Sequence, residues 1–246
     1  MKNSQLLFLG ISSCNHPSIP LRYLGVIVMN FVGTGIRLTS ADYQDAANFL
    51  KTGVAEIRAV VEVEAAGRGF FPDNRLKILF EPHVFYRQLG PGMERDAAVQ
   101  AGVAYKKWKT KPYPKSADER YQQLATAMNI NITMALRSAS WGLPQMMGFN
   151  YAVCGYAGVI SMVEDFKKGE RQQLVAMLKF IQSRGIDDDL RAHRWLDFAK
   201  IYNGPGQAVF YANKLKAAYE KFSQHALVAV MAVPETAEDE DEVALA

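Results

Sequence analysis

The sequence predicts a mainly helical domain that carries a small β-sheet. Apolar residues recur at helical spacing through most of the chain, and several of these segments close with Gly or Asn, as helix ends often do. The segment "RLKILFE" (75–81) alternates instead, directly after a "PDN" turn. A hydrophobic content of 49% in 246 residues is enough to bury one large core. We therefore expect a helical bundle with a β-hairpin or small sheet beside it.

The first two helices have clear boundaries in the sequence. Thr39 or Ser40 is suited to cap a helix that continues to about Leu50, because both side chains can accept a hydrogen bond from the first turn. A second helix is predicted over 54–65, and the glycines at 67 and 69 end it. A third helix can begin at Pro82, directly after the predicted strand.

Downstream, six further segments have the apolar spacing of amphipathic helices. Their residue ranges are 117–129, 132–140, 161–169, 171–185, 193–204 and 208–223. One segment interrupts them. "AYKKWKTKPYPKS" (104–116) contains five lysines, two tyrosines, a tryptophan and two prolines, which predicts a loop. This basic and aromatic lip could grip an anionic or sugar-bearing polymer, or it could be an ordinary solvated loop.

The two ends of the chain differ from this middle part in composition. Residues 1–36 hold two apolar stretches that are each too short to span a bilayer. We expect a disordered or weakly packed leader or a poor signal peptide there, or a stretch that is not native, with Met29 as the natural start. Residues 226–246 include "PETAEDEDEV", with six acidic side chains and no basic one, which predicts a disordered tail. The globular domain is expected over 37–225.

Composition also narrows the possible partners. The formal net charge of +3 is too balanced to indicate a nucleic-acid binder. Two cysteines provide no disulfide framework, and no Cys or His spacing suggests a metal site. We expect no cofactor, no stable membrane insertion and a monomeric protein.

Two glutamates in the second helix differ in their position around its axis. At about 100° per residue, Glu62 points away from the apolar face and can pair with Arg58. Glu64 lies on the side of Ile57 and Val61, in the last turn of the helix. Desolvation and the negative end of the helix dipole both favour its protonated form there. A carboxylic acid that stays protonated near neutral pH is what glycoside cleavage requires.

Two later segments contain residues that suit a polar binding site. In "SASWGLPQMMGFN" (138–150), Gly142 allows a tight turn, and the amide of Gln145 can donate to and accept from sugar hydroxyl and acetamido groups. In "IYNGPG" (201–206), Asn203 and Gly204 suit a helix end and Pro205 suits the next start, so capping alone could explain them.

Three ordered motifs resemble the lysozyme superfamily, in which goose-type lysozymes and soluble lytic transglycosylases carry a helix-ending glutamate followed by two glycan-binding elements. The sequence is more similar to the N-acetylmuramidase family of phage endolysins. That similarity runs from about Leu38 to Phe222 and is carried by "EVEAAGRGFFPDNRLKILFEPHVFYRQL", "LRSASWGLPQMMGFNYAVCGY" and "FAKIYNGPG". It implies an α+β lysozyme-like fold, a helical bundle around the helix of the catalytic glutamate.

The resemblance also implies roles for individual residues. It makes Glu64 the general acid and places Gly142, Leu143 and Gln145 in the glycan-binding cleft. Tyr202 and Asn203 would line the opposite wall. Two positions depart from the family pattern. Ala65 stands where Ser or Thr is usual, and Pro144 stands where an aromatic residue or methionine is usual, so activity could be reduced or shifted.

A second carboxylate is available at Glu81, which follows the predicted strand. Glu81 could activate water or stabilise charge, with His83 beside it as support. Alternatively, Glu81 could cap the helix that begins at Pro82, because a carboxylate is favourable at a helix N-terminus. A histidine at the position of His83 is more often structural than catalytic. His193, which precedes Trp195, is interpreted as part of a helix start.

The resemblance implies a peptidoglycan hydrolase that cleaves the β-1,4 bond between N-acetylmuramic acid and N-acetylglucosamine. Its setting would be that of a phage or prophage endolysin, made in the host cytoplasm and dependent on a holin to reach the wall, or secreted if the leader is a signal. Three alternatives stay open. They are a lytic transglycosylase with a 1,6-anhydro product, a non-catalytic glycan-binding protein and a structural protein of a phage particle.

Overall fold

The computed structural model describes residues 22–23, 26–27, 29–65 and 68–231, and the chain divides into two units, residues 1–30 and 31–246. In the first unit, β1 (Arg22–Tyr23) and β2 (Val26–Ile27) pair antiparallel. Apart from these two strands, the expected leader lies outside the described residues up to residue 28. Residues 232–246 of the expected tail also lie outside them. The other helices and strands belong to the second unit.

Eleven α-helices are formed within the described residues, which confirms the predicted mainly helical fold class. They are α1 (Ser40–Leu50), α2 (Val54–Ala65), α3 (Pro82–Leu89), α4 (Met93–Gln100), α5 (Ala117–Met128), α6 (Ile132–Arg137), α7 (Val159–Phe166), α8 (Glu170–Ser183), α9 (Asp187–Arg191), α10 (Trp195–Tyr202) and α11 (Ala208–Met231). Two short 3₁₀ helices accompany them, η1 (Gly148–Asn150) and η2 (Pro205–Gln207).

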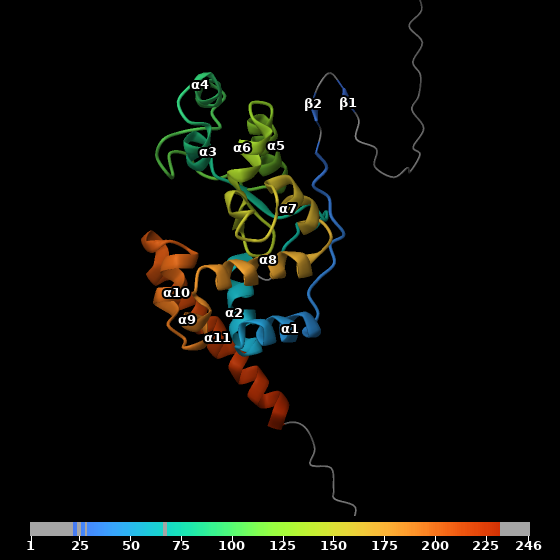
Figure 1. Ribbon diagram of the computed structural model, residues 1–246, viewed down its shortest axis with the longest axis vertical. Helices are drawn as coiled ribbons and strands as arrows, with labels where there is room; N and C mark the ends of the chain where they lie inside the picture. The colour runs from blue at the N-terminus through green and yellow to red at the C-terminus, as the bar shows by residue number, and fades with distance from the viewer. Residues whose placement is uncertain (1–21, 24–25, 28, 66–67, 232–246) are drawn as a thin grey trace, which may run out of the picture. The chain divides into compact units, whose positions relative to one another are not determined.

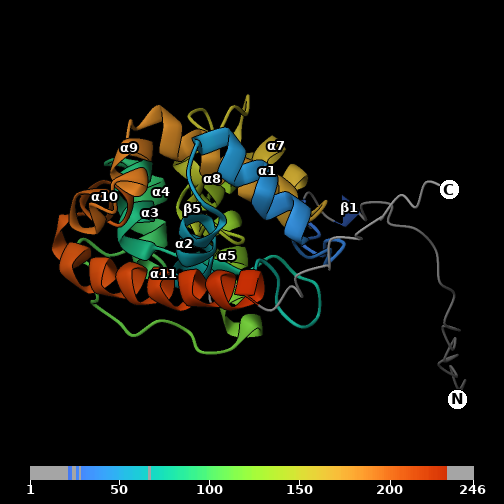
Figure 2. The ribbon, with the colours of Figure 1, turned by 90° about the horizontal axis from the view of Figure 1, so that it is seen from below.

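Helix α2 lies in the middle of the main hydrophobic core. It packs most extensively against the long helix α11 and also against α1, which in turn contacts α8 (Figures 1 and 2). Its apolar face is fully buried at Ile57, Val60 and Val61. Burial on this scale supplies the main favourable term for the position of α2, at about 25 cal/mol per Å² of apolar surface. Glu64, in the last turn of α2, is therefore carried by a helix that is packed into the main hydrophobic core.

The start of α1 and the bounds of α2 agree with the sequence prediction. The Thr39 side chain accepts a hydrogen bond from the Asp42 backbone N–H, and the Asp42 carboxylate accepts one from the Thr39 backbone N–H. This reciprocal capping box satisfies two backbone donors at the helix start. Arg171 at the start of α8 pairs with the same carboxylate at 2.6 Å, which joins α1 to α8.

A three-stranded antiparallel sheet occupies the predicted position and contains two strands that the sequence did not indicate. Its strands are β3 (Ile78–Phe80), β4 (Ala139–Trp141) and β5 (Met146–Met147), in the order β3-β4-β5. The prediction of helix over 132–140 is wrong beyond Arg137, because the chain there pairs with β3 in the register Leu79 to Ser140. Helical spacing in a short apolar segment does not reveal a distant strand partner.

The packed unit also differs from the expected domain bounds. Phe31 is buried and stacks on Trp141 at 5.5 Å between ring centroids, so residues before 37 contribute to the core. At the other end, α11 continues to Met231, six residues beyond 225. Within the described residues, no helix has the length and hydrophobicity that a membrane span requires.

The start of α8 holds two loops together through side chains that are almost completely buried. The Glu170 carboxylate accepts a hydrogen bond from the Gly69 N–H at 2.7 Å, in the loop that follows α2. One turn later, the Gln173 amide oxygen accepts from the Leu143 N–H at 2.6 Å, in the turn that follows β4. A Cβ at Gly69 or Gly142 would lie within 2.6 Å of the Gln173 side chain. Both loops therefore need glycine to approach α8 this closely.

Replacing Gly142 by alanine is expected to destabilise the protein by about 1–3 kcal/mol. Gly142 has a φ of +63°, which disfavours any residue with a Cβ, and the new methyl group would overlap the Gln173 side chain. Urea unfolding monitored by circular dichroism measures the loss. Gly206→Ala is the matched control, because a Cβ there meets no atom within 4 Å. Equal stability of the two variants would contradict this explanation of the turn.

Candidate active site

Glu64 lies in the last turn of α2, partly buried, and contacts a residue from the far end of the chain. The Asn203 side-chain amide donates a hydrogen bond to Glu64 Oε1 at 2.8 Å. Burial raises the pKa of Glu64 from 4.5 to about 7, although the Asn203 hydrogen bond and the Lys214 charge both act to lower it. The carboxyl group is therefore largely protonated in mildly acidic to neutral solution, as the sequence analysis expected.

Glu62 has the exposed environment predicted for it but a different partner. Its carboxylate is 3.7 Å from the Lys221 ammonium group on α11. The predicted pairing with Arg58 is wrong, because the Arg58 guanidinium lies over the Tyr43 ring at 4.4 Å from its centroid. Glu62 and Glu64 are thus in opposite environments, and of these two only Glu64 combines burial with a raised pKa.

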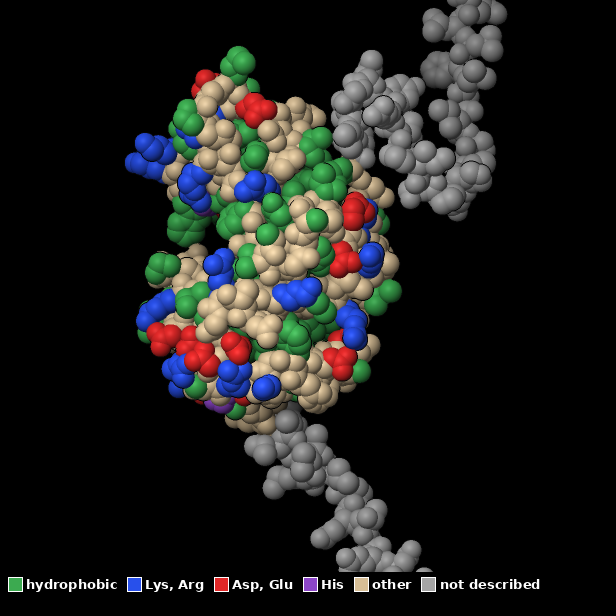
Figure 3. Space-filling view, viewed as in Figure 1, with side chains coloured by type: hydrophobic (Ala, Val, Ile, Leu, Met, Phe, Trp, Pro, Cys, Tyr) green, Lys and Arg blue, Asp and Glu red, His purple; other side chains and the backbone are tan. Residues whose placement is uncertain are grey.

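A cavity of about 590 Å³ lies beside Glu64, between the α3 end of the unit and the α10–α11 connection. Figure 3 shows the surface hollowed there, between the part built from α3 and the part built from α10 in the view of Figure 1. The residues that line it are Leu79, Glu81, His83, Val84, Arg87, Trp108, Lys109, Tyr113, Met147, Phe149, Asn203, Gly204, Pro205, Gly206, Gln207 and Tyr211. The mix of aromatic, apolar and a few polar groups is typical of a small-molecule or glycan site.

Glu64 is connected to this cavity through two residues that do line it. Asn203 holds the Glu64 carboxyl group directly, and its own Oδ1 is buried with no hydrogen-bond partner among the described residues. Tyr211 also lines the cavity, and burial followed by the Glu64 charge raises the pKa of its hydroxyl. A ligand in the cavity could satisfy Asn203 Oδ1, because buried polar atoms normally have partners.

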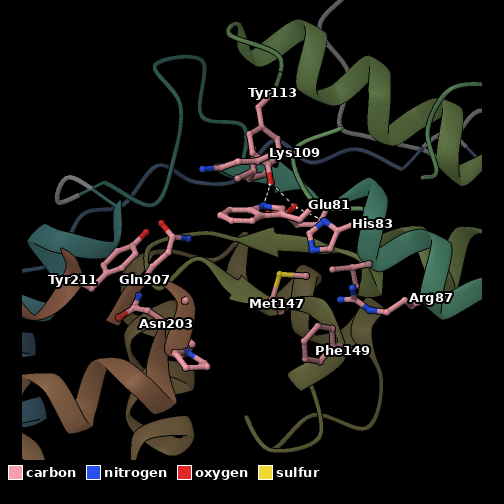
Figure 4. A pocket seen from close by; sticks show the side chains of 16 residues that line it. Glu81, His83, Arg87, Lys109, Tyr113, Met147, Phe149, Asn203, Gln207 and Tyr211 are labelled. Atoms are coloured by element: carbon pink, nitrogen blue, oxygen red, sulfur yellow. Dashed lines mark hydrogen bonds and ion pairs between the residues drawn. The ribbon is translucent and has the colours of Figure 1, made fainter. Parts of the chain in front are cut away.

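Glu81 lies on the opposite side of the cavity from Asn203 (Figure 4). It occupies the N-cap position of α3, but its side chain makes no capping hydrogen bond, so the predicted capping role of the carboxylate is wrong. Instead, Glu81 Oε2 accepts a hydrogen bond from the Tyr113 hydroxyl at 2.7 Å and lies 3.2 Å from His83 Nδ1. Burial raises the pKa of Glu81, while the Tyr113 hydrogen bond and the Arg87 charge act to lower it.

His83 supports Glu81 and has no acidic partner other than Glu81 within the described ranges. Burial, followed by repulsion from Arg87, lowers the pKa of His83 below its ordinary value of 6.5. The imidazole is therefore neutral at physiological pH, when it can share one hydrogen with the carboxylate. His193 lies elsewhere, against Glu56 at 2.8 Å and stacked on Trp195, in a structural cluster.

Tyr202 lies close to Glu64 but behind the cavity wall. Its ring stacks on Phe198 and meets Phe180 edge-on, and its hydroxyl donates a long hydrogen bond of 3.4 Å to the Pro144 carbonyl. Burial, and then the Glu64 charge, raises the pKa of Tyr202 well above 10. The structure thus brings Tyr202, Asn203 and Glu64 together, with Asn203 alone of the three lining the cavity.

The other predicted cleft residues lie in the turn after β4 and do not line the cavity. Leu143 is fully buried in the main core, and Gly142 contacts the Gln173 side chain. The Gln145 amide is occupied within the turn: its nitrogen donates to the Gly142 carbonyl at 2.8 Å, and its oxygen accepts from the Ser140 hydroxyl at 3.0 Å. The Gln145 amide therefore stabilises the turn itself.

Several residues that line the cavity were not predicted from the sequence. Gln207 and Tyr211 follow the "IYNGPG" motif, and Met147 and Phe149 lie in the segment that contains Gln145. Their closeness to recognised motifs was a signal for them. Glu170 and Gln173, which hold the two loops against α8, were not predicted either. Their spacing of three residues indicates that both lie on one face of the helix. No group of three or more His, Cys, Asp or Glu side chains that could hold a metal occurs in the described part of the chain.

Replacing Asn203 by leucine is expected to move the alkaline limit of activity to higher pH. The Asn203 hydrogen bond stabilises the ionised form of Glu64, so its loss raises the Glu64 pKa above about 7. The rate at the optimum should also fall, by about tenfold or more, because Glu64 loses the group that orients it. The pH profile of peptidoglycan solubilisation measures both effects. An unchanged alkaline limit would contradict the role of this contact.

Comparison with known proteins agrees with this geometry. The sequence profile of the N-acetylmuramidase family matches residues 53–223, which include Glu64, Glu81 and Asn203. The chain belongs to the N-acetylmuramidase family. It is therefore a glycoside hydrolase of the kind that acts on peptidoglycan, as the sequence motifs indicated.

The fold is also similar to that of a solved phage endolysin. The crystal structure of the Burkholderia AP3 phage endolysin matches with a TM-score of 0.67 and 37% sequence identity, over 77% of this chain and 72% of that chain. The predicted resemblance to phage endolysins is confirmed by this match. The search of curated proteins finds no match.

Proposed function

We propose that this muramidase cleaves the β-1,4 bond between N-acetylmuramic acid and N-acetylglucosamine in bacterial peptidoglycan, with Glu64 as the general acid. The observation that carries the proposal is the Glu64 carboxyl group, which has a pKa of about 7 and is held by Asn203 at the edge of a glycan-sized cavity. A protonated carboxyl group can give its hydrogen to the glycosidic oxygen as the bond to the sugar breaks.

Glu81 is the second carboxylate in this proposal. Cleavage leaves an oxocarbenium-like sugar that needs negative charge nearby and a water molecule to capture it. Glu81 lines the cavity on the side away from Asn203, and Tyr113 and Arg87 both favour its ionised form. An ionised Glu81 can stabilise the positive charge and accept a proton from the attacking water. Glu64 in its raised-pKa site and Glu81 with these partners then have the complementary roles of acid and base.

Other predicted site residues are assigned by their position. Asn203 contacts the glycan and orients Glu64, because it lines the cavity and has an unpaired Oδ1. Tyr202 supports the wall behind Asn203. Gly142, Leu143 and Gln145 form the turn beside it and hold the cleft in shape. The departure at Pro144 leaves the Glu64 site intact, since Pro144 meets Tyr202 through its backbone carbonyl.

In its biological setting, the protein is proposed to act as a monomeric phage or prophage endolysin. The unit that begins at Phe31 and includes α11 would be made in the host cytoplasm and reach the wall through a holin-dependent lesion. Residues 1–30 of the expected leader and the acidic residues after α11 would lie outside the catalytic part. Glycan strands of the wall are the partner in this proposal, with no requirement for a cofactor.

The products of purified peptidoglycan identify the reaction. Soluble fragments released by the wild-type protein are analysed by mass spectrometry before and after borohydride reduction. The proposal predicts fragments with reducing N-acetylmuramic acid ends. Reducing N-acetylglucosamine ends would show that the other glycosidic bond is cleaved. Fragments lighter by one water, with 1,6-anhydro ends, would show a lytic transglycosylase and would overturn the hydrolase assignment.

A further inference from the structure

The lip, residues 104–116, is attached to the cavity by a series of two hydrogen bonds. Trp108 Nε1 donates to the Tyr113 hydroxyl oxygen at 2.9 Å, and the Tyr113 hydroxyl donates to Glu81 Oε2 at 2.7 Å. His83 Nδ1 lies 3.2 Å from the same carboxylate oxygen. Glu81 Oε1 accepts no hydrogen bond from any described residue, so one oxygen is held and the other is available to a ligand.

Trp108 is an exposed aromatic side chain held in one position. It is 45% exposed and lines the cavity. Lys109 and Tyr113 from the same lip also line it (Figure 4). The Lys109 ammonium group lies over the Trp108 ring at 4.3 Å from the centroid. A lysine on one face and a hydrogen bond at the ring edge leave the opposite face for a ligand. Because the ring is already held in place, less conformational entropy is lost when a ligand binds.

We propose that Trp108 is a sugar-stacking surface of this cavity and that Tyr113 is the positioning residue that holds it against Glu81. The inference rests on the proposed function and adds a subsite to it. The ligand is the apolar face of an N-acetylated hexosamine in a β-1,4-linked glycan, because a flat indole binds the C–H face of a sugar ring while polar groups at the edge meet its hydroxyls. Glu81 and Asn203 provide such polar groups from two sides.

The same contacts connect sugar binding to the charge of Glu81. A hydrogen bond from Tyr113 to an ionised carboxylate is stronger than one to the neutral acid. The charged and titratable groups that face Glu81 are Tyr113, His83, Arg87 and Tyr105. As the pH falls through the raised pKa of Glu81, the Tyr113 bond loses its charge assistance and the hold on Trp108 weakens. Sugar binding is therefore expected to weaken in acid.

The test uses the full-length Glu64→Gln protein, which can bind glycan without consuming it, and chitotriose, a neutral β-1,4-linked N-acetylglucosamine trimer. Calorimetry gives the Kd, and iodide quenching of tryptophan fluorescence reports on Trp108. Trp141 and Trp195 are only 0% and 9% exposed, so Trp108 is the tryptophan that iodide can reach among the described residues. Chitotriose is expected to reduce the quenching.

Two further substitutions are made in this background. Trp108→Ala should remove most of the iodide quenching, which identifies Trp108 as its source, and should raise the Kd by about tenfold or more. Tyr113→Phe keeps the ring but removes the hydroxyl that joins Trp108 to Glu81, and should raise the Kd by about tenfold. It should also remove the weakening of binding at low pH, which a loss of packing alone would not do. Tyr86→Phe is the matched control, because Tyr86 lies outside the lip and the cavity, with Arg95 over its ring, and its Kd should be unchanged.

An unchanged Kd in both Trp108→Ala and Tyr113→Phe would overturn the proposed subsite. So would an absence of chitotriose binding to the folded Glu64→Gln protein, even if the wild-type protein digests peptidoglycan. Conversely, Trp108-dependent binding by a protein that releases no peptidoglycan fragments would support the subsite and reject the proposed cleavage. The two proposals can therefore fail separately.

Discussion

Replacing Glu64 by glutamine is expected to lower the rate of peptidoglycan solubilisation by about 10²- to 10⁴-fold. Glutamine has nearly the same shape and can still face Asn203, but it cannot give a proton to the glycosidic oxygen. Burial is what keeps about half of Glu64 protonated at pH 7, so no exposed carboxyl group of the protein can take over this role. The rate is measured by release of soluble fragments from dye-labelled peptidoglycan, with folding checked by circular dichroism.

Glu62→Gln is the matched control for this change. Glu62 lies two residues earlier on the same helix and pairs at 3.7 Å with Lys221 across the surface. Exposed pairs of this kind contribute about 0–1 kcal/mol, so both stability and activity should stay near those of the wild type. Equal activity of Glu64→Gln and Glu62→Gln would remove Glu64 from the mechanism.

Replacing Glu81 by glutamine is expected to lower the same rate by about 10²-fold. The amide oxygen can still accept the Tyr113 hydrogen bond, so the lip should keep its position, but the negative charge on the cavity wall is lost. Wild-type activity should also fall at low pH, as Glu81 becomes protonated through its raised pKa. The acidic limb of the pH profile should disappear in Glu81→Gln, while the alkaline limb near pH 7, set by Glu64, should stay.

Glu94→Gln is the control for the second carboxylate, because Glu94 is exposed on α4 and accepts a hydrogen bond from Asn131 outside the cavity. It should change neither the rate nor the pH profile. Full activity in Glu81→Gln would show that water captures the sugar without help from this carboxylate, and that Glu64 acts alone.

The parts of the fold that could be predicted are those that depend on neighbouring residues. Helix α2 could be predicted from its apolar spacing, and the phase of that spacing placed Glu64 on the buried side. The lip could be predicted from its prolines and lysines. In contrast, the spacing of apolar residues in β4 predicts a helix, because the partner strand β3 lies about 60 residues earlier in the chain. The short polar helices α4 and α9 have too few apolar residues to show a period.

In the candidate site, too, features that depend on neighbouring residues could be predicted, and contacts between residues far apart in the chain could not. The raised pKa of Glu64 could be predicted from its own helix, but its contact with Asn203 joins residues 139 positions apart. The family resemblance implied only that Asn203 lines the opposite wall of the cleft. The contact between Tyr113 and Glu81 spans 32 positions and had no sequence signal. Glu81 was therefore assigned two possible roles, and only the tertiary contact showed that its side chain does not cap α3.

The pKa of Glu64 itself tests the central claim most directly. Full-length protein labelled with ¹³C at the glutamate carboxyl carbons is titrated by NMR, and the Glu64 signal is assigned by its loss in Glu64→Gln. A pKa of about 7 is expected, because burial outweighs the Asn203 hydrogen bond and the Lys214 charge. A pKa near the ordinary 4.5 would mean that Glu64 is ionised at neutral pH and would contradict its role as the general acid.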